Sequence, residues 1–198
     1  MSGGLQLIPG VGCHEEVSIL INNDTRLLKL KEVIHSVARE EDLILRRLSG
    51  SGILRMPELA FTHQVAKGLL TRAQEILGVT SFQWEMNKGI GAGLTDLVVN
   101  PGQGEKCIAI EFKMSGDYRN YVSDIRKLQQ LDSATYDRVF CALMDVFVAD
   151  LTTHPRIKAV EENVDVPVQR VGEYFDFFST LHSFKTQTCC VIGLWFVP

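Results

Sequence analysis

The run LTDLVVN at residues 94–100, followed after a short turn by CIAIEFK at residues 107–113, decides the fold. Both runs are mostly apolar, as expected of strands in a buried sheet. Side chains alternate between the two faces of a strand, so Glu111 and Lys113 share one face of the second run. In the first run, Asp96 lies on the face opposite the apolar side chains of Leu97 and Val99. A buried strand carries a Glu and a Lys on one face only if they are paired or functional. The short turn makes the two acids neighbours.

Two neighbouring acids followed by a lysine indicate a particular chemistry. Two carboxylates held close together repel each other unless a cation lies between them. Oxygen-only ligands suit Mg²⁺ or Mn²⁺ rather than Zn²⁺. Lys113 can orient or deprotonate a water on that metal, or offset charge that develops on a phosphate. The pattern therefore predicts metal-dependent hydrolysis of a phosphodiester bond by Asp96, Glu111 and Lys113.

Regular periodicity continues on both sides of these two strands. The predicted helices cover residues 27–48, 57–77, 118–131, 152–163 and 173–184, and the further predicted strands cover residues 80–85, 138–148 and 189–197. Pro57 suits the first turn of its helix. The order predicts an α/β fold, a mixed sheet flanked by helices, in a single domain of 198 residues.

The first of these helices is amphipathic. Its apolar residues recur at helical spacing, close to a heptad, from Leu27 to Leu48. Such a stripe either packs on the core or forms an interface with a partner, and we favour the core. The second interpretation would make this helix the contact of a symmetric homodimer.

Composition bounds the setting of the protein. The chain is 45% hydrophobic and 22% charged, with a net charge of −4 and five cysteines. No apolar run reaches the roughly eighteen residues of a membrane-spanning helix, and the N-terminus does not resemble a signal peptide. An odd number of cysteines without a CxxC pair indicates free thiols. We therefore expect a cytoplasmic protein without a membrane partner. Its net charge is not the strongly basic one that would by itself indicate binding to nucleic acid.

The decisive stretch also resembles a known family. Asp96, followed after a turn by Glu111-Phe112-Lys113 inside hydrophobic strands, is similar to the motif of the PD-(D/E)xK nuclease superfamily, which includes restriction endonucleases. The resemblance covers residues 55–150, which would form the nuclease core between N-terminal helical and C-terminal α/β additions. The family often adds a glutamate from the helix before the strands, and Glu58 fits that position. The chain departs from the family at Thr95, where the motif has proline.

The resemblance implies a restriction-endonuclease-like fold and a Mg²⁺-dependent (or Mn²⁺-dependent) endonuclease acting on DNA. Asp96, Glu111 and Glu58 would hold the metal, with Glu58 acting directly or through water, and Lys113 would position the attacking water. Basic residues near this site are candidates for a track that binds phosphates. They are Lys88, Lys106, Arg119, Arg126 and Lys127.

Each of these residues also has a purely structural interpretation. Glu111 and Lys113 can form an ion pair on an exposed sheet edge, Asp96 can be a turn acid, and Glu58 can be an acid favoured by the helix dipole. For the whole chain, one alternative is a nuclease fold without cleavage that acts as a binding module for protein or nucleic acid. Another is an unrelated α/β protein in which Asp96 and Glu111 lie on opposite faces.

Overall fold

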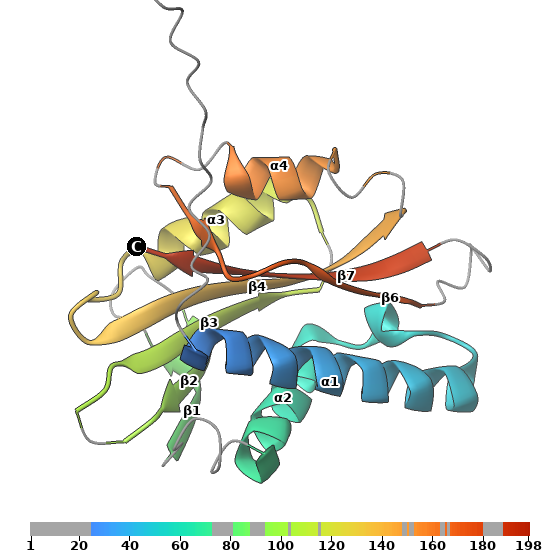
Figure 1. Cartoon of the computed structure of the whole chain (residues 1–198), viewed down its shortest axis with the longest axis horizontal. Helices are drawn as coiled ribbons and strands as arrows, with labels where there is room; N and C mark the ends of the chain where they lie inside the picture. Colours follow the sequence, from blue (N-terminus) through green and yellow to red (C-terminus); the bar gives the residue numbers. More distant parts are fainter. Residues whose placement is uncertain are drawn as a thin grey trace, which may run out of the picture.

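The computed structural model describes residues 25–72, 81–87, 94–102, 104–114, 116–147, 150, 153–162, 165, 167–179 and 188–198. A seven-stranded mixed sheet runs through the middle of the molecule and carries helices on both faces (Figure 1). The predicted α/β class, a mixed sheet flanked by helices, is confirmed.

The helices are α1 (Thr25–Ser49), α2 (Glu58–Arg72), α3 (Tyr118–Leu128) and α4 (Pro155–Glu161), with a short 3-10 helix η1 (Ile53–Arg55) between α1 and α2. The strands are β1 (Ser81–Asn87), β2 (Leu94–Asn100), β3 (Cys107–Lys113), β4 (Tyr136–Phe147), β5 (Gln169–Arg170), β6 (Phe175–Phe178) and β7 (Thr188–Val197). Helices α3 and α4 cover one face of the sheet, and α1 and α2 cover the other (Figure 1). None of the described helices is long and apolar enough to span a bilayer.

The sheet topology follows from the lengths of the connections. Strands β1, β2 and β3 form the antiparallel meander that the short turns predict. Helix α3 then crosses over, so that β4 lies parallel to β3. Strand β7 pairs antiparallel with β4, and its other edge receives β5 and β6. The crossover places the ends of β3 and β4 and the start of α3 in one region of the molecule.

The predicted helix at residues 173–184 is wrong in its described part. Phe175–Phe178 is a strand, and residues 180–184 lie outside the described residues. Phe175 and Phe177 pack against the core while Phe178 stays exposed, which is the two-residue alternation of a strand. Cys190, Val191 and Ile192 of β7 lie fully buried in the middle of that strand, where β6 supplies their hydrogen-bonding partner. The need to pair this buried edge overrides a local preference for helix.

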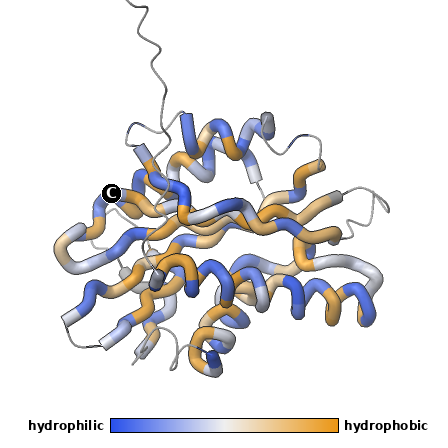
Figure 2. The backbone as a smooth tube through the Cα atoms, viewed as in Figure 1, coloured by the Kyte–Doolittle hydropathy of each residue, from blue (hydrophilic) through white to orange (hydrophobic). Residues whose placement is uncertain are grey.

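The apolar stripe of α1 divides into two parts. From Leu27 to Ala38 it is buried against the sheet and α2, which confirms the core interpretation for this half. Gly68 of α2 permits close packing, since a Cβ there would lie 2.5 Å from Val37 Cγ2. Beyond this point Ile44 and Leu48 are 46% and 79% exposed. The stripe remains apolar to the end of α1 (Figure 2), but its last two turns are not covered by the described residues.

Candidate active site

The two predicted acids lie side by side where β2 begins and the antiparallel strand β3 ends. The strands pair with Leu97 opposite Ile110 and Val98 opposite Ala109. Continuing this register by one residue places Asp96 opposite Glu111, on the sheet face that α3 covers. Glu111 is only 7% exposed, and Asp96 is half-buried. The alternative in which the two acids occupy opposite faces is therefore not the arrangement found.

The backbone ladder between β2 and β3 stops at this point. The last paired residues are Leu97 and Ile110, and the next amide on that edge, Phe112 N, donates to Asp96 Oδ2 at 2.7 Å. A carboxylate thus accepts the hydrogen bond that a continued ladder would direct to backbone. The strand ends can separate here without leaving this buried amide unsatisfied. One oxygen of Asp96 is fixed in position by this contact.

Lys113 lies two residues beyond Glu111 on the same face and is largely buried, with 20% of its side chain exposed. Its Nζ is 3.3 Å from Glu58 Oε1 and 3.1 Å from Asp124 Oδ2. Burial lowers the pKa of Lys113, but Asp124 and then Glu58 outweigh that effect and raise it above the ordinary value. The side chain is therefore an ammonium that bridges α2 and α3 at the end of β3.

Glu58 serves this bridge from the first turn of α2. Its Oε1 contacts Lys113 Nζ, and its Oε2 accepts a hydrogen bond from Met114 N at 2.9 Å. Both of its oxygens are thus directed at the end of β3. The predicted metal-ligand role of Glu58 has less support than a role in holding Lys113, because no carboxylate oxygen of Glu58 is left without a neighbour.

Asp124 is a site residue that the sequence reasoning missed. It is buried on α3, and its Oδ1 accepts a hydrogen bond from Lys127 Nζ at 2.6 Å. A signal was present in the sequence. Asp124 is three residues after Tyr121 and four before Leu128, so it belongs to the apolar stripe that packs on the sheet. An acid within such a stripe requires a buried partner, and Lys113 is that partner.

The donor set fits one form of the predicted metal site. Among the described residues, no three acidic, histidine or cysteine side chains gather closely enough to hold a metal ion by themselves. A site with Asp96, Glu111 and Glu58 as three direct ligands is therefore not formed. Mg²⁺, however, commonly binds through one or two carboxylates and keeps water and phosphate oxygens as its other ligands. Asp96 and Glu111 fit that form by their chemistry and their adjacency.

The predicted phosphate-binding cations are mostly engaged with other groups. Lys88 lies outside the described residues. Arg119 and Arg126 on α3 are well exposed, so they remain accessible to a substrate. The four described cations have these contacts: Lys106 with Ser133 O, Arg119 with Asp117, Arg126 with Asp165, and Lys127 with Asp124.

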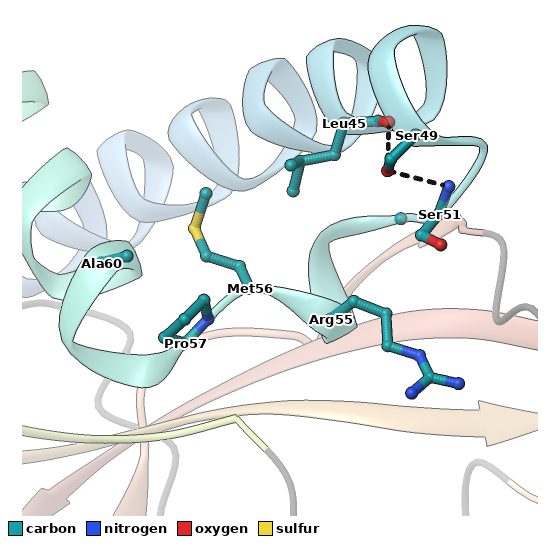
Figure 3. Close-up of a pocket in the computed structure, with 8 residues that line it drawn as sticks. Leu45, Ser49, Ser51, Arg55, Met56, Pro57 and Ala60 are labelled. Carbon is teal, nitrogen blue, oxygen red and sulfur yellow. Dashed lines mark hydrogen bonds between the residues drawn. The ribbon is translucent and has the colours of Figure 1, made fainter.

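A hollow of about 480 Å³ lies between the end of α1, η1 and the start of α2 (Figure 3), and none of the candidate acids lines it. Leu45, Met56, Pro57 and Ala60 give it a mainly apolar lining. No acidic side chain lines it, so it offers no carboxylate ligand for a metal. We therefore place the candidate chemistry at the ends of β2 and β3 rather than in this hollow.

Comparison of the chain with protein-family models, with curated proteins and with solved structures gave no match. The assignment of function accordingly rests on the residues of the site: two adjacent acids, a buried ammonium, and the two carboxylates that hold it.

Proposed function

We propose that this protein is a Mg²⁺-dependent (or Mn²⁺-dependent) nuclease of the PD-(D/E)xK superfamily, with a restriction-endonuclease-like fold, which hydrolyses phosphodiester bonds of DNA. One observation carries the proposal. Asp96 and Glu111 are opposite each other at neighbouring strand ends, and Lys113 lies on the same face two residues further on. Adjacent acids beside a fixed cation are the groups that phosphodiester hydrolysis requires.

Each side chain has a role in this proposal. Asp96 and Glu111 would hold the divalent ion, which when bound supplies an activated water and a Lewis acid for the phosphate. Lys113 provides a fixed positive charge toward the phosphate and orients the attacking water. Glu58 positions Lys113 and the end of β3 through its contacts with Lys113 Nζ and Met114 N. Arg119 and Arg126, both exposed on α3, contact the DNA backbone.

Nicking of a supercoiled plasmid tests the proposal. We expect cleavage with Mg²⁺ and none with EDTA, and we expect Asp96→Asn and Glu111→Gln to abolish it. Both variants should fold, and their melting temperature should stay the same or rise, because one of two repelling acids is removed. Glu32→Gln, which changes an exposed acid on α1 on the other face of the sheet, is the control and should cleave normally. Full activity in Asp96→Asn or Glu111→Gln would show the assignment to be wrong.

A second candidate function, a nuclease fold without cleavage that acts as a binding module, is favoured by one observation. The described cations around the site are paired with acids or carbonyls, and the whole chain carries a net charge of −4. Such a surface gives weak non-specific attraction to DNA. The same plasmid experiment separates the two candidates, because a binding module would retain nucleic acid or protein without any Mg²⁺-dependent nicking.

We also propose that the exposed end of α1 is the contact of a homodimer. Ile44 and Leu48 are exposed on the last turns of α1. Glu40 and Arg47 are seven residues apart on one edge of this stripe, so an antiparallel crossing near Ile44 brings Arg47 of each copy to Glu40 of the other.

Light scattering tests the dimer. It should detect a dimer in the wild type and a folded monomer in the double variant Ile44→Glu with Leu48→Glu. A wild-type monomer would contradict the proposal. Val37→Glu, by contrast, should prevent folding, because Val37 is buried in the core.

The cysteines support a reducing, cytoplasmic setting. The described cysteines are free, and three of them, Cys141, Cys189 and Cys190, are buried. Burial raises the pKa of Cys189 to about 11, with a smaller contribution from its contact with Asp176. A thiol with such a pKa stays protonated and unreactive at neutral pH. These cysteines are therefore packing residues, as expected in a compartment that keeps thiols reduced.

A further inference from the structure

We infer that Asp124 is a positioning residue for the candidate reaction, which holds the ammonium of Lys113 at the acid pair and acts only through that lysine. The inference rests on the proposed function, since it assigns a task to the same site. Asp124 lies eleven positions beyond Lys113, on the helix that follows β3. No sequence motif joins the two residues, and only the β3–α3–β4 crossover brings them together.

The first argument is the environment of the carboxylate. The side chain of Asp124 is 6% exposed, whereas that of Glu58, the other acid at Lys113, is 35% exposed. An ion pair is stronger where water is excluded, because the effective dielectric constant is lower. The Asp124 contact is also the shorter, at 3.1 Å against 3.3 Å. Of the two charges at Lys113, that of Asp124 is therefore the less screened by water.

The second argument is that Asp124 is itself held in place. Its Oδ1 receives Lys127 Nζ at 2.6 Å, while its Oδ2 faces Lys113. The Lys113 contact is close enough for an ion pair but is not aligned as a hydrogen bond. The carboxylate is thus anchored by Lys127 on one side and attracts Lys113 on the other. Two lysines also offset the cost of burying one carboxylate, which an acid in an apolar helix stripe would otherwise carry.

The third argument is the direction in which Lys113 would move without Asp124. Glu58 is in the first turn of α2 and is partly open to solvent. With Glu58 as its remaining partner, the long and flexible Lys113 side chain gains freedom to leave the acid pair for water. Asp124 restrains it on the face where Asp96 and Glu111 lie. The expected consequence is a loss of turnover with little change in substrate affinity, because the lost interaction is that of the transition state.

Asp124→Asn tests the inference by two independent measurements. The first is a ¹H–¹⁵N spectrum of lysine ammonium groups, in which a buried, ion-paired Lys113 should give a resolved signal that disappears in Lys113→Met. We expect Asp124→Asn to broaden or remove this signal. The second is cleavage kinetics with Mg²⁺, where we expect kcat to fall by about tenfold or more and KM to change by less than about threefold. Glu32→Gln, which removes the charge of an exposed acid on α1, across the sheet from the site, is the control and should alter neither measurement.

The outcomes separate this inference from the proposed function. If Asp124→Asn keeps the Lys113 signal, or keeps kcat, Asp124 is not a positioning residue. If the wild-type protein never cleaves, the proposed function fails, and the spectrum still decides whether Asp124 fixes Lys113. Asp124→Glu guards against a folding defect, because it restores the carboxylate and should recover part of the signal and of kcat. If folded Asp124→Glu is no better than Asp124→Asn, the role is one of packing and the inference is overturned.

Discussion

Two lysines lie inside this molecule on opposite faces of the sheet, and their surroundings are opposite in kind. Lys31 on α1 is 1% exposed, and its Nζ donates to Val171 O at 2.7 Å and to Glu173 O. These partners are neutral carbonyl groups, and burial lowers the pKa of Lys31 to about 8. Lys113 is less deeply buried but sits between two carboxylates, which raise its pKa. The two ammonium groups thus differ in the charge of their partners, which are neutral carbonyls for Lys31 and carboxylates for Lys113.

The difference shows that burial of a lysine does not by itself indicate function. Lys31 closes the turn before β6, where Gly172 has a φ of +60° and a Cβ would lie 3.0 Å from Leu28 Cδ2. It joins α1 to this turn and serves the fold. Lys113 is held by acids from two helices beside a further pair of acids, an arrangement with more charge than the fold requires. The type of partner therefore separates the structural lysine from the candidate catalytic one.

The largest expected effect is on turnover. Lys113→Met keeps the aliphatic stem and removes the charge, so we expect kcat to fall by about a hundredfold or more, as for a positioned catalytic group. Lys31→Met should leave kcat of the folded protein unchanged, because Lys31 lies on the other sheet face. Single-turnover plasmid nicking measures both variants, and Mg²⁺ affinity should change in neither. Equal losses in the two variants would remove the distinction between the lysines.

A pH dependence of stability is the second expected effect. The pKa of Lys31 is about 8 in the folded protein and 10.5 ordinarily, so the unfolded chain binds more protons between these values. The stability of the wild type relative to Lys31→Met should therefore rise between pH 8 and 10.5, by at most about 1.4 kcal/mol per pH unit. Urea unfolding below pH 8 and near pH 10.5 measures this difference, in which other titrating groups cancel. A difference that falls with pH would mean that the ammonium is stabilised by its site.

The sequence predicted most of the elements, because the buried residues of α1, α2 and α3 recur at helical spacing and the mostly apolar runs of β2 and β3 are buried strands. It misplaced the aromatic segment at Phe175–Phe178 because β6 forms to pair with β7, a contact between distant parts of the chain. Strand β5 has two residues, too few for any period. Tertiary pairing, rather than local preference, decides both segments.

The candidate site was also predictable only where a local sequence pattern determines it. Strand alternation and a short turn were enough to bring Asp96 and Glu111 together and to place Lys113 on their face. Asp124 joins them only because α3 packs back on the sheet, and this packing depends on the crossover to β4. The contacts of Glu58 with Lys113 Nζ and Met114 N were not predictable, because no spacing in the sequence specifies them.

The smallest expected effect concerns Glu58, the more exposed of the two acids that contact Lys113. Glu58→Gln keeps an oxygen that can accept from Met114 N but loses the ion pair with Lys113. Because this pair is partly exposed, it contributes about 1 kcal/mol or less, and Asp124 still holds the lysine. We therefore expect kcat to fall by less than about tenfold. Calorimetric titration should give an unchanged Mg²⁺ affinity, since Asp96 and Glu111 are the proposed ligands. A clear loss of Mg²⁺ binding would instead make Glu58 a third ligand, and Lys113 would then depend on Asp124 alone.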